Sequence, residues 1–149
     1  MTKMKSLILL LLASATLSYA GLVRPMPLLP GDEPSPDYEL LVDGKPVPVA
    51  FGTFNGNQSF HHATFEMQGR SQVTVRFSGD LPDSIEVVPS RHAITLERSR
   101  STVNFELDQP LKLVLKAKGK RPFFLFALPP EAAAPHPDDP HVHDFGPGV

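Results

Sequence analysis

The sequence predicts an all-β protein, an antiparallel β-sandwich of about nine short strands preceded by a cleaved signal peptide. Three observations indicate this class. Apolar and polar residues alternate with a period of two between Tyr38 and Leu128. Turn sequences recur about every 8–12 residues, as in sandwiches and barrels. No stretch after the first 20 residues keeps a helical period. Sheets with one apolar face need a second sheet to cover it, which favours a sandwich.

Residues 1–20 are predicted to form a secretory signal peptide. Two lysines precede the apolar run Leu7–Leu12, and the small residues Ser18 and Ala20 fit a signal-peptidase site. The run is too short to span a membrane, which takes roughly 20 apolar residues. We therefore expect a secreted protein, extracellular or, in a bacterium, periplasmic, with no membrane association after cleavage.

Proline divides the remaining chain into three parts. Of 17 prolines, five lie in residues 21–37, six in 38–128 and six in 129–149. Proline removes a ladder hydrogen bond and fixes an extended backbone. We therefore predict a Pro-rich N-terminal arm (21–37), a β-sandwich domain (38–128) and a Pro/His-rich linker (129–149).

Within the central domain, each strand is predicted from alternation between turn sequences. Asp43-Gly44 separates the first two apolar runs and is typical of a hairpin. A polar loop over 55–58 follows, and the later strands alternate between turns. The final run, "FFLFAL", is apolar on both faces, which favours a central or covered strand. The expected strands are 38–42, 47–51, 63–67, 73–77, 85–87, 94–97, 103–107, 111–115 and 123–128.

Composition excludes several classes of function. The chain has no cysteine, so it has neither disulfides nor thiolate chemistry. Its formal charge is −2; removing two lysines with the signal peptide leaves 12 basic and 16 acidic residues, or −4. Basic residues cluster only at one predicted turn, so we expect no nucleic-acid partner. That cluster is Lys116, Lys118, Lys120 and Arg121.

We expect no catalytic carboxylate pair in this chain. Glycoside hydrolysis uses two carboxylates flanking one bond. The acids here lie on predicted solvent-facing strand positions or in turns, where solvation and turn formation explain them. The solvent-facing set is Glu66, Glu86, Glu97 and Glu106.

The tail holds the densest group of potential metal ligands: His136, Asp138, Asp139, His141, His143 and Asp144. In an extended chain His141 and His143 point to the same side, where both imidazoles could bind one metal ion. Imidazole and carboxylate ligands suit zinc or copper. Prolines space the group and no rigid scaffold holds it, so we interpret it as a linker and expect no metal or cofactor. Metal capture by His136, His141 and His143 stays an alternative. His61 and His62 are adjacent on a strand and point to opposite faces, which disfavours joint ligation.

Phe54 and Phe60 are the candidate glycan contacts. Sugars commonly stack on exposed aromatic rings, but the chain has no Trp, and Tyr38 is the only Tyr beyond the signal peptide. Phe54 and Phe60 flank the Asn-rich loop and could present their rings to a sugar. The alternative is that both rings pack in the core and anchor the loop there. Asn57 begins the sequon Asn-Gln-Ser in that loop and is a glycosylation candidate in a eukaryotic secretory pathway.

Four segments in order carry a resemblance to a known family: "YELLVDGKPVPV", "SIEVVPSRHAITL", "VNFELDQPLKLVL" and "FFLFALPPEAAAPHPDDPHVHDFGPGV". Over 38–149 the chain resembles the N-terminal β-sandwich domain of secreted polysaccharide hydrolases whose catalytic part is a right-handed β-helix. Dextranase/isopullulanase-like and polygalacturonase-like enzymes are the nearest of these.

The resemblance implies a non-catalytic accessory domain of a glycoside hydrolase. The family's catalytic carboxylates lie on the β-helix, so none is carried over to this chain, and the chain alone is not expected to be an enzyme. "FGPGV" (145–149) resembles the link into the first β-helix coil, which implies a fragment truncated before its partner domain. Polysaccharide is a further possible partner. The alternative is a stand-alone secreted module that binds carbohydrate or a surface protein.

Overall fold

A computed structural model describes residues 22–132 and Pro140 of the 149-residue chain. The predicted signal peptide, most of the linker and the candidate metal ligands of the tail lie outside the described residues. Within the described part there is no helix with the length and hydropathy needed to cross a membrane.

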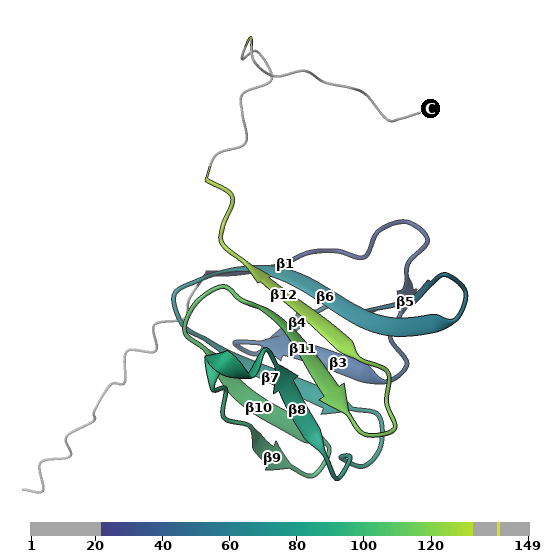
Figure 1. The fold of residues 1–149 in the computed structure, drawn as a ribbon. Helices are drawn as coiled ribbons and strands as arrows, with labels where there is room; N and C mark the ends of the chain where they lie inside the picture. The colour runs from purple at the N-terminus through teal and green to yellow at the C-terminus, as the bar shows by residue number, and fades with distance from the viewer. Residues whose placement is uncertain (1–21, 133–139, 141–149) are drawn as a thin grey trace, which may run out of the picture.

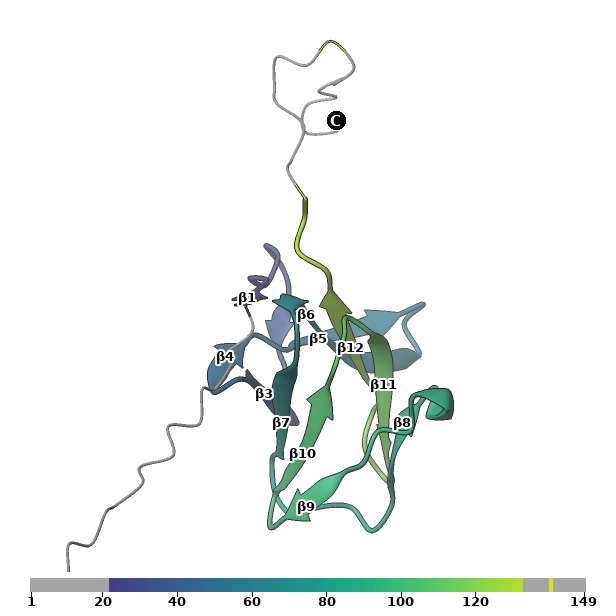
Figure 2. The ribbon, with the colours of Figure 1, turned by 90° about the vertical axis from the view of Figure 1, so that its left-hand side faces the viewer.

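Two sheets enclose one hydrophobic core, so the predicted β-sandwich is confirmed (Figures 1 and 2). The seven-stranded sheet has the path β2-β5-β6-β12-β11-β8, and β1 also pairs with β6. Its strands are β1 (Leu22–Pro25), β2 (Glu33–Pro34), β5 (Ala50–Phe54), β6 (Gln58–Gln68), β8 (Ile85–Val88), β11 (Lys112–Ala117) and β12 (Phe123–Leu128).

The five-stranded sheet has the order β4-β3-β7-β10-β9. Its strands are β3 (Tyr38–Val42), β4 (Lys45–Val47), β7 (Ser71–Phe77), β9 (Glu97–Ser99) and β10 (Thr102–Leu107). A 3-10 turn, η1 (Ser90–His92), follows β8.

The predicted alternation correctly identifies the core. Both sheets contribute side chains that are at most 6% exposed, because alternate residues of a strand face the opposite sheet. From the seven-stranded sheet these include Ala63, Phe65, Met67, Leu113, Leu115, Phe123 and Leu125; from the other they include Leu40, Val42, Val73, Val75, Val103 and Phe105. Removing such a side chain typically costs about 2–5 kcal/mol, so this core accounts for much of the fold's stability.

The described residues form twelve strands rather than about nine. Two of the additional strands, β1 and β2, lie within the predicted arm, and Val23 of β1 is 5% exposed in the core. The predicted strand 47–51 is divided: Val47 ends β4 in one sheet and Ala50 begins β5 in the other. The break falls at Pro48, which cannot donate a ladder hydrogen bond. The strand expected over 94–97 is displaced to β9.

One strand pair departs from the expected antiparallel arrangement. β12 runs parallel to β6, with Phe123 beside His61 and Leu128 beside Glu66. β12 follows β11 through a short turn and pairs with it antiparallel, so its direction is set by that hairpin. The last of the described strands therefore lies in the middle of the sheet, with β6 on one side and β11 on the other, as "FFLFAL" predicts for a central strand.

Candidate functional site

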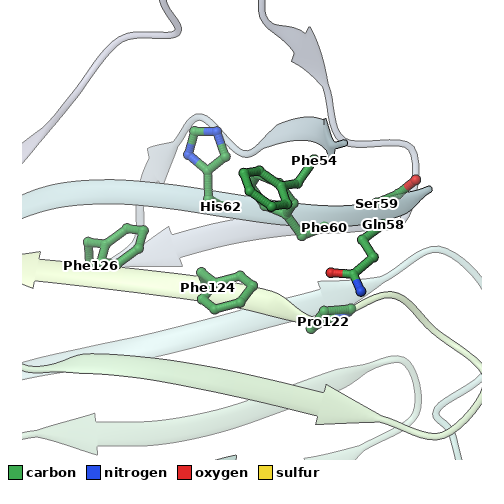
Figure 3. A pocket seen from close by; sticks show the side chains of 8 residues that line it. All are labelled: Phe54, Gln58, Ser59, Phe60, His62, Pro122, Phe124 and Phe126. Carbon is green, nitrogen blue, oxygen red and sulfur yellow. The ribbon is translucent and has the colours of Figure 1, made fainter. Parts of the chain in front are cut away.

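The outer face of the seven-stranded sheet carries a hollow of about 550 Å³. Figure 3 shows its side chains, which come from the β5–β6 hairpin, the start of β12 and the residue before β12. We call it the phenylalanine hollow. Its lining residues are Phe54, Gln58, Ser59, Phe60, His62, Pro122, Phe124 and Phe126. Both glycan-contact candidates predicted from the sequence, Phe54 and Phe60, are among them.

Strand alternation produces the aromatic lining. On β6, His61 and Ala63 face the core, so Phe60 and His62 face outward. On β12, Phe123 and Leu125 are buried, so Phe124 and Phe126 are left on the outer face, partly exposed. The parallel pairing of β6 and β12 sets the two outward rows side by side.

The rings contact one another in defined geometries. Phe60 and Phe124 meet edge to face, with centroids 5.8 Å apart and planes at 86°. Phe124 and Phe126 are nearly parallel, at 15° and 6.4 Å. Aromatic pairs of this kind favour such offset and edge-on contacts. The rings therefore form a shared surface in which each orientation depends on its neighbour.

The absence of a side chain at Gly52 leaves room for the Phe60 ring. The two residues are paired across β5 and β6, and a Cβ at position 52 would lie 3.2 Å from the tip of the Phe60 ring. The ring thus lies over the glycine backbone, as aromatic residues do beside strand glycines. Phe54, also on β5, is 61% exposed at the rim.

The hollow is apolar but has polar groups at its edge. Its eight described lining residues include no Asp, Glu, Lys or Arg. Gln58, Ser59 and His62 supply hydrogen-bond donors and acceptors. An apolar concave surface with a few polar groups is the usual composition of a small-molecule site. This one suits an uncharged ligand.

Asn57 lies in the hairpin turn beside the hollow. Asn55 and Gly56 both have positive φ, 50° and 70°, and the Asn57 amide donates to the Phe54 carbonyl. Positive φ at both central residues of a turn gives a twist that matches the twist of the flanking strands. Asn57 is exposed, and the other two sequon residues, Gln58 and Ser59, line the hollow.

A polar cluster surrounds His61 on the inner face of β6. Ser35 Oγ lies 2.9 Å from His61 Nδ1 and accepts hydrogen bonds from the Asp37 and Tyr38 amides. The serine hydrogen is therefore free to be donated to Nδ1, which leaves the ring proton on Nε2. Nε2 lies 3.2 Å from Asp37 Oδ2, at an angle poor for a hydrogen bond. Lys120 Nζ lies 3.2 Å from the other Asp37 oxygen.

This Ser-His-Asp group lacks the geometry of a hydrolytic triad. The His61 ring is fully buried, and Ser35 is tied to two backbone amides. Burial lowers the pKa of His61, and the neighbouring Asp37 carboxylate only partly offsets this. The cluster instead joins the segment before β3 to β6. By strand alternation His61 shares a face with Ala63 and Phe65, and that face is buried. Its partners Ser35 and Asp37 are distant in the chain and carry no recognisable signal.

Glu66 is a correction to the expected solvent-facing acids. It is 7% exposed because β1 pairs alongside it, with Arg24 directly opposite. Arg24 Nη1 lies 3.7 Å from Glu66 Oε2. The other three predicted positions, Glu86, Glu97 and Glu106, are exposed as expected.

Comparison with known proteins supports a relation at the level of fold. No protein-family model matches the chain, and no curated protein is significantly similar to it. Among solved structures, Dex49A from Penicillium minioluteum, a dextranase, superposes with a TM-score of 0.58 at 12% sequence identity. The match covers 71% of this chain and 31% of that chain.

At this identity the likeness shows a shared fold. The chain spans less than a third of the dextranase it matches. The resemblance to polysaccharide hydrolases seen in the sequence is thus supported as a loose structural relation to a glycoside hydrolase.

Proposed function

We propose that this chain is a non-catalytic accessory domain of a secreted glycoside hydrolase acting on polysaccharide. The observation that carries the proposal is the β-sandwich shared with part of a dextranase, over 71% of this chain and 31% of that one. Hydrolysis of O-glycosyl bonds would be performed by a β-helix domain, on the same polypeptide or on a separate one.

The surface chemistry of the sandwich supports this role. Several described acids are held in ion pairs with basic side chains: Glu39 with Arg76, Glu66 with Arg24, Glu106 with Arg70, and Asp37 with Lys120. The partly exposed phenylalanines instead concentrate on one outer face. We interpret this grouping of partly exposed aromatic rings as the binding surface of the domain.

The test is to isolate the native protein with an antibody raised against residues 38–128. The isolate is supplied with dextran and a panel of other polysaccharides, and new reducing ends are measured. We expect hydrolysis by the isolate and none by the purified 149-residue chain. An isolate obtained with pre-immune antibody is the control. A native protein of 16.3 kDa or less that brings down no hydrolytic activity would contradict the proposal.

A stand-alone secreted binding module is the second candidate. It is favoured by the polar groups Gln58, Ser59 and His62 at the edge of the hollow, which suit a ligand with hydroxyl groups. In this case the isolate has no hydrolytic activity but retains affinity for a polysaccharide or a surface protein.

A further inference from the structure

We propose that the phenylalanine hollow binds a stretch of uncharged polysaccharide, whose pyranose rings stack on its phenylalanine rings. The inference rests on the proposed function and names the ligand class of the accessory domain. It extends the site beyond Phe54 and Phe60 to Phe124, Phe126, His62 and Gln58.

The shape of the hollow suits a short length of a chain molecule. Its volume of about 550 Å³ lies inside the range of about 300–1,000 Å³ typical of small-molecule sites. The lining is elongated: Figure 3 shows Gln58 and Pro122 at one end and Phe126 at the other, with Phe60 and Phe124 between them. An elongated open trough can hold successive sugar units without enclosing the chain ends.

The ring surfaces suit the apolar side of a sugar. A pyranose presents C–H groups on its faces and hydroxyls around its edge. The face of a phenylalanine ring carries partial negative charge and attracts such weakly positive C–H groups. These rings lose little rotamer freedom on binding because Phe60, Phe124 and Phe126 already pack on one another and on the sheet.

The polar edge suits the hydroxyl groups. Each hydroxyl both donates and accepts, and the Gln58 amide and His62 imidazole offer the same pair of functions. The absence of carboxylate, ammonium and guanidinium groups from the described lining gives no attraction to uronate or sulfate chains. These features favour a neutral glycan over an anionic one.

A protein is the competing occupant of this face. A flat apolar patch would favour a protein partner. This face is an open hollow whose lining carries three side chains able to pair with hydroxyls, which favours the glycan.

The experiment is affinity electrophoresis of the purified chain through gels containing dextran, a neutral β-glucan or polygalacturonate. The protein is produced in bacteria so that Asn57 carries no glycan. We expect retardation by at least one neutral glucan and none by polygalacturonate.

Single substitutions locate the site. Phe124→Leu and Phe126→Leu remove a ring but keep an apolar side chain, so the fold is expected to persist, as circular dichroism checks. An aromatic contact is worth about 0.5–1.5 kcal/mol, so each should weaken binding roughly 2- to 10-fold. Leu22→Ala is the control, since Leu22 is 58% exposed on β1 and is not part of the lining.

The outcomes separate the two proposals. A folded chain that no neutral glucan retards, or variants that bind like the wild type, would overturn the glycan site. If these variants instead lose only the native hydrolytic activity brought down with the protein, the face binds the catalytic partner, and the proposed function stands without the glycan site. Glucan binding by a protein with no associated hydrolase overturns the proposed function alone.

Discussion

His61 and His62 are neighbours in the chain but lie on opposite faces of β6. His61 is enclosed by the core and contacts Ser35 and Asp37, while His62 lines the phenylalanine hollow. Strand geometry alone produces this separation. It also gives the two imidazoles different solvent access, and the buried one, His61, is expected to couple folding to pH.

The stability of the domain is expected to fall as the pH drops below about 6.5, the ordinary pKa of histidine. Burial lowers the pKa of His61 in the folded state. Between the lowered value and about 6.5, the unfolded chain binds a proton that the folded one does not, so unfolding is favoured. Above about 6.5 both states are neutral at this residue and its contribution is constant. Urea unfolding midpoints from pH 8 to pH 5 measure the effect.

Substitutions separate the effect of His61 on stability from the effect of carboxylates, which also bind protons on acidification. His61→Gln should flatten the dependence between pH 7 and pH 5, at a cost of about 1–3 kcal/mol at pH 8 because it disturbs buried polar partners. His62→Gln, one position along β6 on the outer face, is the matched control. If the unfolding midpoint of His61→Gln depends on pH as strongly as that of the wild type, another group causes the pH dependence.

At the residue level, the sequence singles out lining residues that lie beside a loop signal, but not those on the outer face of a strand. Phe54 and Phe60 flank the Asn-rich loop, so they could be singled out. Phe124 and Phe126 lie in "FFLFAL", which is apolar on both faces and favours a central or covered strand, so the pattern does not single out its outward residues. In a two-layer sandwich only one face of a strand is covered, so alternate phenylalanines of a central strand remain outside.

At the scale of the element, the β5–β6 hairpin depends on a residue without a side chain. Gly52→Val should displace Phe60, since the Cβ alone would lie 3.2 Å from the ring and the branched methyls need more room. The ring can shift toward solvent, so we expect a stability loss within roughly 1–2 kcal/mol. Glucan retardation should weaken, which the same electrophoresis measures.

Thr53→Val is the matched control for that substitution. Thr53 is the next residue on β5, is exposed, and is not part of the hollow. It introduces the same side chain one position along the same strand. Equal retardation of the Gly52 variant and the wild type would show that the position of Phe60 has no role in binding.

Alternation predicts that a strand exists but not which sheet contains it. The run over 47–51 has a strand pattern, yet Val47 and Ala50 belong to different sheets. The crossing requires a bend that Pro48 permits, and both halves keep their apolar side inward. The same limit applies to β1, whose pairing with β6 buries Val23 and covers Glu66.

At the scale of the whole molecule, β12 joins the two parts of the seven-stranded sheet. A chain of residues 22–122 lacks it, and with it the buried Phe123, Leu125 and Ala127. Losing Phe123 and Leu125 alone would cost about 5–10 kcal/mol, comparable to the usual stability of a domain. We expect no cooperative unfolding transition in urea and no dispersed amide signals in the NMR spectrum.

A chain of residues 22–132 is the control for that truncation. It keeps the twelve strands and the core that the structure describes, and we expect it to unfold cooperatively. A native-like spectrum from the shorter chain would mean that β6 and β11 can close the sheet without β12.

The sandwich class followed from local alternation, but the order of strands did not. The pairs β3–β4 and β11–β12 join strands close in sequence, and turn signals reveal them. β6 and β12 are separated by most of the domain, and their parallel register depends on how the whole core packs. Local patterns carry no information about such pairs, which is also why the two rows of the hollow could not be placed together.

Synthesis on the ribosome adds a consequence of the central position of β12. It is the last of the described strands to emerge, so the growing chain already contains β6 and β11 while the place between them is vacant. Each then presents an unpaired strand edge, to which a strand of another chain can add. Association between nascent or newly released chains is therefore most probable during this interval. The arrival of one strand of six residues closes both edges at once.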